Sequence, residues 1–225
     1  PDVITYNAAI SACGRGHHWL LASGLLTEMM HAVLYPSTIS YNAAITACER
    51  AENWSLALEL LKQMDSQSIT PVVVTYNATI SACAKGHQGM IALRLFSEMQ
   101  DLEVLPDTVT CNVAIGACSG ARWACSLELL EYMRWRRLEA DVITYSTAIT
   151  AVGKGEQWPL ALALLKEMRG AAVAPNAITF NAVVDACERG GVWQAAVDLV
   201  QTMVSQMGAG IIAFGSAVAA CARAG

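Results

Sequence analysis

The stretch Pro1-Asp-Val-Ile-Thr-Tyr-Asn7 decides the fold of this 225-residue chain, because it returns six more times. The next copies are Pro36-Ser-Thr-Ile-Ser-Tyr-Asn42, Pro71-Val-Val-Val-Thr-Tyr-Asn77 and Pro106-Asp-Thr-Val-Thr-Cys-Asn112. Weaker copies are Ala140-Asp-Val-Ile-Thr-Tyr-Ser146, Pro175-Asn-Ala-Ile-Thr-Phe-Asn181 and Ala209-Gly-Ile-Ile-Ala-Phe-Gly215. Consecutive copies start 35, 35, 35, 34, 35 and 34 residues apart. A fixed period of this length is the signature of a repeat architecture.

The chain is therefore expected to form a single array of six whole repeats and half of a seventh. The repeat bounds are 1–35, 36–70, 71–105, 106–139, 140–174, 175–208 and, for the partial repeat, 209–225. A methionine recurs near the end of each whole repeat and supports this register; the positions are Met29, Met64, Met99, Met133, Met168 and Met203. Since the pattern is cut at Gly225, we expect the array to be a piece of a longer one.

Each repeat is predicted to contain two helices. The first runs from Asp2 to about Cys13, because Pro1 enforces an extended entry and Asp2 is a good N-cap. Gly14-Arg-Gly16 is expected to end it. The second helix runs from about Trp19 to His31.

Both helices carry a stripe of apolar or small residues at helical spacing. The stripe is Tyr6, Ile10 and Cys13 in the first helix, and Ala22, Leu26 and Met29 in the second. A single hairpin cannot bury both stripes, whereas stacked hairpins bury them in a continuous core. The predicted fold is all-α, an α-solenoid (superhelix) of stacked helix-turn-helix hairpins.

The repeat resembles the pentatricopeptide repeat (PPR) family. The resemblance rests on the 35-residue period, the Val-Ile-Thr-Tyr-Asn opening, the Pro-Asp boundary and the Glu28-Met29 ending of the second helix. It implies an organellar protein, of the chloroplast or mitochondrion, that binds single-stranded RNA with one nucleotide per repeat. Tetratricopeptide repeats are a poorer match, because their Trp-x-x-Leu-Gly-x-x-Tyr opening is absent. Val72, Cys111 and Gly210 depart from the family pattern.

A polar stripe follows each first helix and is predicted to form a groove. Asn7, Ser11 and Arg15 share one face, with Ile4 one turn before them. β-branched residues at the place of Ile4 offer stiff surfaces that can sandwich a base; they are Ile4, Ile39, Val74, Val109, Ile143 and Ile178. Cations at the place of Arg15 can meet phosphate; they are Arg15, Arg50, Lys85, Lys154, Arg189 and Arg223. The same features could instead be helix caps and C-terminal charges of a structural face.

The family resemblance further implies that each base is read by two residues. These are the Asn or Ser of the first helix and the residue after the boundary position of the following repeat. The implied pairs are Asn7 with Ser37, Asn42 with Val72, Asn77 with Asp107, Asn112 with Asp141, Ser146 with Asn176 and Asn181 with Gly210. The family's rule then gives a site near 5′-C-Y-U-U-A-Y-3′, in which the second and last letters are weakly specified.

The acidic composition argues against strong non-specific binding to nucleic acid. The net charge is −5, and Lys and Arg are the residues that neutralise phosphate. Six of the 14 basic residues nevertheless fall on the predicted groove, while several acidic residues fall on the second helices. We therefore expect base contacts to supply most of the affinity.

Eight cysteines raise the question of metal or disulfide chemistry, but six share one repeat position: Cys13, Cys48, Cys83, Cys118, Cys187 and Cys221. Packed helices are about 8–10 Å apart, which exceeds disulfide reach, so these residues are predicted to be small core residues. We expect no metal, cofactor, catalytic site, small-molecule substrate or membrane span.

The sequence thus predicts sequence-selective binding of single-stranded RNA in organellar RNA processing, stabilisation or translation. Other RNA-processing proteins are possible partners. The alternative is a protein–protein interaction scaffold that uses the concave solenoid face. The discriminating feature is the face itself, because RNA requires Asn and Lys/Arg aligned along it.

Overall fold

A computed structural model describes residues 2–207, and every regular element in this range is a helix. The predicted all-α class is confirmed. The chain splits into two compact units, Pro1–Ala117 and Cys118–Gly225. The predicted seventh half-repeat, together with Gly210 and Arg223, lies outside the described residues. No helix within residues 2–207 is long and apolar enough to cross a membrane.

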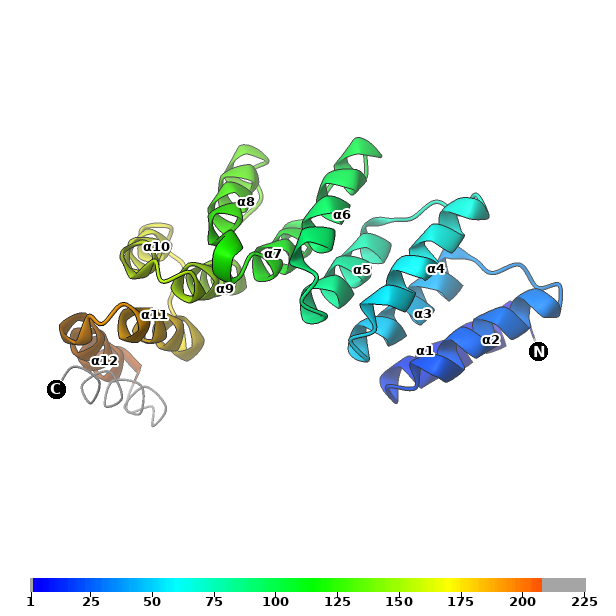
Figure 1. Cartoon of the computed structure of the whole chain (residues 1–225), viewed down its shortest axis with the longest axis horizontal. Coiled ribbons are helices and arrows are strands. Elements are labelled where there is room, and N and C mark those ends of the chain that lie inside the picture. The colour runs from blue at the N-terminus through cyan, green and yellow to red at the C-terminus, as the bar shows by residue number, and fades with distance from the viewer. Residues whose placement is uncertain (1, 208–225) are drawn as a thin grey trace. The chain divides into compact units, whose positions relative to one another are not determined.

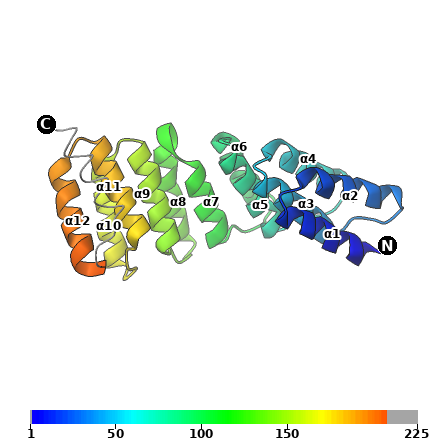
Figure 2. The same cartoon turned by 90° about the horizontal axis from the view of Figure 1, so that it is seen from below.

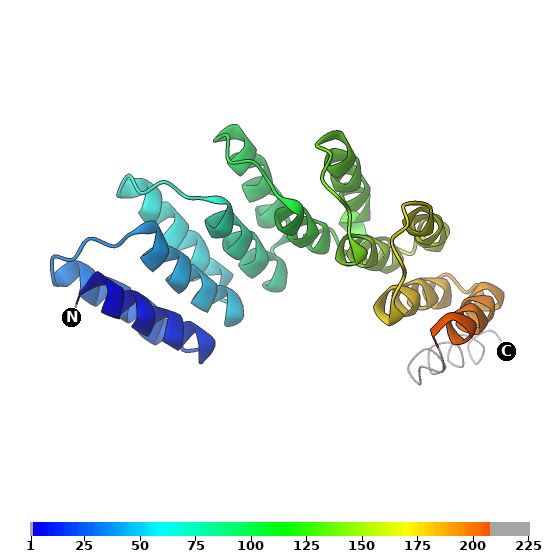
Figure 3. The ribbon, with the colours of Figure 1, turned by 180° about the vertical axis from the view of Figure 1, so that it is seen from behind.

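The first unit is a two-layered stack of helical hairpins. Its helices are α1 (Val3–Arg15), α2 (Trp19–His31), α3 (Thr38–Arg50), α4 (Trp54–Ser66), α5 (Val73–Lys85), α6 (Gly89–Asp101) and α7 (Thr108–Ala117). In one layer, α1, α3, α5 and α7 pack on one another in chain order (Figures 1 and 3). In the other, α2, α4 and α6 each pack on the first helix of their own repeat and of the next.

The second unit repeats this arrangement. It contains a short 3-10 turn, η1 (Gly120–Arg122), followed by α8 (Trp123–Trp135), α9 (Val142–Lys154), α10 (Trp158–Gly170), α11 (Ala177–Arg189) and α12 (Trp193–Met207). The first helices α9 and α11 pack together, α10 packs on both, and α12 packs on α11 (Figure 2). The predicted stripes are buried, as Tyr6, Ile10 and Leu26 illustrate in α1 and α2.

The first helices begin where the sequence predicts, and their caps explain why. Asp2 accepts a hydrogen bond from the backbone N–H of Thr5 at 2.9 Å through its Oδ1. Asn176 accepts one from the N–H of Thr179 at 3.0 Å. Each satisfies a donor that the first turn of a helix leaves unpaired. Val72 has no side-chain acceptor, so only the reverse half of the capping box forms there, from its own N–H to the Thr75 hydroxyl.

The first helix ends within the predicted segment Gly14-Arg-Gly16, but two residues later than the expected end near Cys13. Helix α1 continues to Arg15, and Gly14 is buried inside it. A Cβ atom at Gly14 would lie 3.3 Å from Cβ of Ala47 on α3, so the missing side chain serves close approach of two first helices. The residue that turns the chain is His17, which has a left-handed φ of 60°.

Each of three tryptophans that open second helices packs against a glycine of the next repeat. A Cβ atom at Gly86 would lie 2.2 Å from Cδ1 of Trp54, and one at Gly155 would lie 2.3 Å from Cδ1 of Trp123. A Cβ atom at Gly190 would lie 2.2 Å from Cδ1 of Trp158. The glycine after a first helix is therefore required by the indole of the preceding repeat.

Most of the recurrent cysteines are core residues, as predicted. Cys48, Cys83, Cys118 and Cys187 are fully buried, whereas Cys13 is half-buried and Cys221 lies outside the described residues. Burial raises the pKa of Cys48 to about 11 and that of Cys118 to about 12. These thiols therefore stay protonated at neutral pH, which makes them poor nucleophiles.

The hairpin turns suggest a stabilising substitution. Val33 follows α2 with a left-handed φ of 59°, a conformation that costs a β-branched residue about 1–2 kcal/mol. Since its side chain is 73% exposed, Val33→Gly is expected to raise the free energy of unfolding by about 1 kcal/mol. Urea denaturation followed by circular dichroism measures it. Gly191, with φ 68°, is the matched control, because Gly191→Ala should change stability in the opposite direction.

Candidate nucleic-acid interface

Each first helix of both units carries one exposed β-branched residue at the same repeat position. The six predicted base-sandwiching residues are 56–77% exposed; they are Ile4, Ile39, Val74, Val109, Ile143 and Ile178. Large apolar side chains are usually buried when packing alone determines their place. Their recurrence at one position of every described repeat makes this face a candidate binding surface.

In the first unit, the predicted site residues of two repeats border one hollow. A cavity of about 380 Å³ opens between α1 and α3. It is lined by Ser11, Gly14 and Arg15 from α1 and by Ile39, Asn42, Ala43, Thr46 and Arg50 from α3. A predicted sandwiching residue, a predicted base-reading residue and two predicted phosphate-facing residues thus line one hollow.

In the second unit, a corresponding hollow of about 260 Å³ lies between α9 and α11. Its lining includes Ile143 and Ser146 of one repeat, and Asn176 and Ile178 of the next. The base-reading pair predicted for this repeat therefore lines the same hollow as two exposed isoleucines. This arrangement offers polar groups to the edge of a planar ligand and aliphatic surfaces to its faces.

Two of the predicted base-reading asparagines are held by a threonine of the following repeat. Oδ1 of Asn42 accepts a hydrogen bond from the hydroxyl of Thr75 at 2.6 Å. Oδ1 of Asn77 accepts one from the hydroxyl of Thr110 at 2.6 Å, and Nδ2 of Asn77 donates to Oδ1 of Asp107 at 3.3 Å. The predicted pair of Asn77 with Asp107 is therefore in direct contact.

Hydrogen bonds keep Asp107 ionised. Burial alone would raise the pKa of its carboxyl group, but bonds from the backbone N–H and hydroxyl of Thr110 and from the Asn77 amide together lower it. This carboxylate therefore presents only acceptors beside Asn77 at neutral pH.

The remaining pairs differ in what the structure brings together. The hydroxyl groups of Ser146 and Thr179 are hydrogen-bonded at 2.8 Å. Oδ1 of Asn7 is buried and has no hydrogen-bond partner among residues 2–207. Asn112 and Asp141 belong to different units, and the partner of Asn181 is Gly210, outside the described range.

Two of the predicted phosphate-facing cations are paired with acids of the same face. Lys85 forms a 2.9 Å salt bridge with Glu49, whose carboxylate also accepts a hydrogen bond from Ser81. Arg189 is 3.1 Å from Asp185. Sequence reasoning missed the role of Glu49, although it lies seven residues after Asn42 and therefore on nearly the same helix face. Arg15, Arg50 and Lys154 are exposed.

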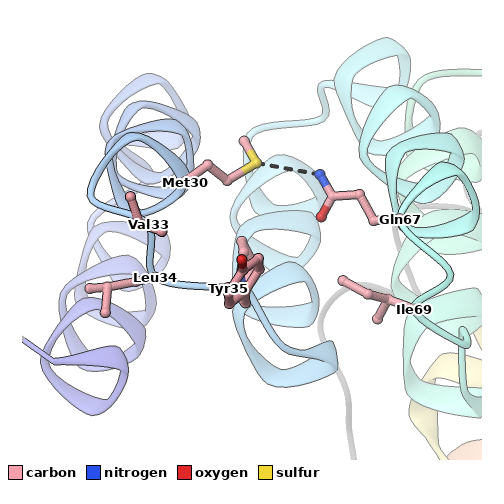
Figure 4. A pocket seen from close by; sticks show the side chains of 7 residues that line it. Met30, Val33, Leu34, Tyr35, Gln67 and Ile69 are labelled. Carbon is pink, nitrogen blue, oxygen red and sulfur yellow. Dashed lines mark hydrogen bonds between the residues drawn. The ribbon is translucent and has the colours of Figure 1, made fainter.

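A larger apolar cavity lies away from these residues. It has a volume of about 480 Å³ and is lined by Met30, Val33, Leu34, Tyr35, Pro36, Gln67 and Ile69 (Figure 4). The Gln67 side-chain amide donates to the sulfur of Met30 at 3.4 Å. This cavity contains none of the predicted site residues. Within residues 2–207, no cluster of three or more His, Cys, Asp or Glu side chains could hold a metal ion.

Comparison with solved structures places the chain among repeat proteins of one kind. The pentatricopeptide repeat protein PPR10 from maize is 28% identical, with a TM-score of 0.80 over 100% of this chain and 32% of that one. PPR10 bound to an 18-nt psaJ RNA element is 25% identical, with a TM-score of 0.68 over 98% of this chain and 36% of that one. This chain thus spans about a third of PPR10.

Sequence profiles extend the comparison across the repeats. A search among curated protein sequences found no match. A profile of the PPR repeat family matches residues 36–85, 71–120 and 140–189, and a profile of the PPR repeat matches residues 4–32 and 178–206. These matches cover most of the chain in the register of its own internal period. The chain belongs to the pentatricopeptide repeat family.

Proposed function

We propose that this chain binds single-stranded RNA along the face formed by its first helices, and that it selects the RNA by its bases. The observation that carries the proposal is the hollow between α9 and α11. Ile143 and Ile178 line it together with Ser146 and Asn176. Unpaired bases are recognised by contacts to their faces combined with hydrogen bonds to their edges. This hollow supplies both in one place.

The similar protein PPR10 supports the proposal, because it has been solved in complex with an 18-nt RNA element. By analogy, consecutive repeats of this chain read consecutive nucleotides, and the site 5′-C-Y-U-U-A-Y-3′ remains our prediction. We further propose, from family membership, that the protein acts in a chloroplast or mitochondrion on RNA processing, stabilisation or translation. It binds without chemistry of its own and acts with other RNA-processing proteins.

Attraction between the protein's cations and the RNA phosphates is proposed to make a modest contribution to the affinity. The chain carries a net charge of −5, and Lys85 is already paired with Glu49. A phosphate that approaches Lys85 must compete with this carboxylate. We therefore expect a shallow dependence of affinity on salt, since few counterions are released from the RNA.

The test is binding of the purified chain to fluorescent RNAs, measured at two salt concentrations, with double-stranded RNA and DNA as controls. Asn77→Ala combined with Asn112→Ala is expected to weaken binding to the predicted strand about thirtyfold, from two hydrogen bonds of about 1 kcal/mol each. Asn53→Ala is the matched control. Asn53 caps α4 in the other layer, so its loss should leave RNA affinity unchanged.

Two results would contradict the proposal. One is a folded chain that binds no strand even at low salt, which would favour the protein-interaction scaffold. The other is equal weakening by Asn53→Ala and by the Asn77 and Asn112 pair. That result would mean that the effect comes from lost stability rather than from lost base contacts.

A further inference from the structure

The hydroxyl group of Thr75 links two consecutive repeats. Thr75 is the third residue of α5 and is fully buried. Its Oγ1 accepts a hydrogen bond from the backbone N–H of Val72 at 3.1 Å. The same Oγ1 lies 2.6 Å from Oδ1 of Asn42, which belongs to the preceding repeat. Thr75 therefore contacts the side chain that is proposed to read a base.

Burial fixes the direction of this hydrogen bond. The hydroxyl group has a single proton, and Oδ1 of Asn42 is the acceptor that the described residues offer to it. If the amide were rotated by half a turn, Nδ2 would donate to Oγ1 and the buried hydroxyl proton would lose its partner. A buried donor without a partner is strongly disfavoured. Oδ1 of Asn42 is thus held against Thr75, and Nδ2 points the other way.

Resting on the proposed binding of RNA, we infer that Thr75 is a positioning residue that determines which base Asn42 selects. It fixes the amide oxygen of Asn42, so that Nδ2, a donor, is the group left to contact a base. A donor at this place requires an acceptor on the base. Both pyrimidines offer their O2 carbonyl, whereas adenine has no carbonyl oxygen: its acceptors are ring nitrogens, and its N1 lies beside the N6 amino group, which is a donor.

The corresponding asparagines of neighbouring repeats differ in the contacts that orient their amide groups. Asn77 is fixed through Asp107, which accepts from its Nδ2, and the single hydroxyl proton of Thr110 lies within reach of both Oδ1 of Asn77 at 2.6 Å and Oδ1 of Asp107 at 2.8 Å. A rotated Asn77 amide would place its oxygen against the Asp107 carboxylate. At Asn42 the corresponding partner is Val72, which has no polar side chain, so Thr75 alone determines the orientation.

In the repeat that follows Asn7, the third residue of the first helix (α3) is Ser40 rather than a threonine. Oγ of Ser40 accepts from the backbone N–H of Ser37 at 3.0 Å and lies 3.3 Å from the Ser37 hydroxyl. The buried Oδ1 of Asn7 has no partner within residues 2–207. The orientation of Asn7 is therefore not imposed by the following repeat, and its base preference should be the weakest of the three.

The test compares base preference in variants that differ at the threonine. Four RNAs are used, which differ only at the second position of 5′-C-Y-U-U-A-Y-3′. The unmodified chain should prefer pyrimidines over adenine about tenfold at this position, and Thr75→Val should reduce the ratio to about twofold. Thr75→Ser should restore the preference. Thr110→Val, tested at the third position, should keep its preference, because Asp107 still orients Asn77.

A structural role of Thr75 would produce a different pattern. Thr79 is also fully buried, and its hydroxyl donates its single proton to the Thr75 carbonyl at 2.9 Å rather than to Asn42. Thr79→Val should therefore cost similar stability and leave the base ratio unchanged. If Thr75→Val does not fold, Asn42→Asp tests the same orientation. It presents an oxygen in place of Nδ2 and should shift the preference from uracil, which has no amino group, towards adenine.

The outcomes separate this inference from the proposed function. Thr75→Val that binds RNA with the full pyrimidine preference overturns the inference and leaves RNA binding intact, as does Asn42→Asp with an unchanged preference. Failure of the unmodified chain to bind any of the four RNAs overturns both, and that result is seen before any variant is compared.

Discussion

Replacing Ile39 and Val74 together by alanine is expected to weaken RNA binding about a hundredfold without destabilising the fold. The two side chains are 67% and 58% exposed in the free chain. At about 0.8 kcal/mol for each carbon that a bound base would cover, partial covering of the removed carbons amounts to about 3 kcal/mol. The free energy of unfolding should change by less than about 0.5 kcal/mol, as is usual for exposed positions.

Met90 and Leu102 provide the matched control for this pair. They are 65% and 59% exposed, but they lie on and just after the second helix α6. Replacing both by alanine removes a similar amount of exposed apolar surface. Fluorescence anisotropy should show unchanged RNA affinity for this control. Equal weakening by the two double variants would show that exposed apolar surface acts non-specifically and would remove the sandwiching role.

Gly153→Leu is expected to destabilise the chain by about 3 kcal/mol. Gly153 is buried in α9, and even a Cβ atom there would lie 2.9 Å from Cβ of Ala186 on α11. A leucine would separate the two first helices that form the core of the second unit, and overpacking of this kind typically costs about 1–3 kcal/mol. Urea denaturation followed by circular dichroism measures the change.

The same substitution at Gly24 should have the opposite effect. Gly24 lies within α2, and an added Cβ atom would meet nothing within 4 Å. Gly24→Leu should stabilise the chain by up to about 1 kcal/mol, because leucine is the better helix former. If Gly153→Leu unfolds at the same urea concentration as the unmodified chain, the close approach of α9 and α11 is not required.

The sequence was sufficient to predict the elements that depend on local chemistry. Proline followed by Asp or Asn places a helix start, and the periodic Tyr6 and Ile10 identify the buried face. The same local reasoning ended the first helix two residues early, before Gly14, because glycine both terminates helices and allows them to approach. Only the position of Ala47 on the next first helix distinguishes these two uses.

The sequence predicted which residues of the candidate site share a helix face, but not which of them contact one another. Spacing alone places Asn42 and Ile39 on one face. It does not show that Glu49 reaches across to Lys85, or that Thr75 reaches back to Asn42, since both contacts depend on how far successive helices are displaced. The presence of Thr75 is also explained by its role in capping α5. The sequence therefore gave no sign that its hydroxyl also binds Asn42.

The hydrogen bond from Thr75 to Asn42 also determines which segment of the chain must be moved into another repeat array to transfer a base preference. A cassette cut at the prolines, residues 36–70, would carry Asn42 into a new array and leave the threonine that orients it behind. A cassette cut from Asn42 to Thr75 would keep both partners, together with Val72. Chimeric arrays joined inside the first helices should therefore inherit the base preference of the donor, whereas arrays joined at the prolines would take it partly from the acceptor.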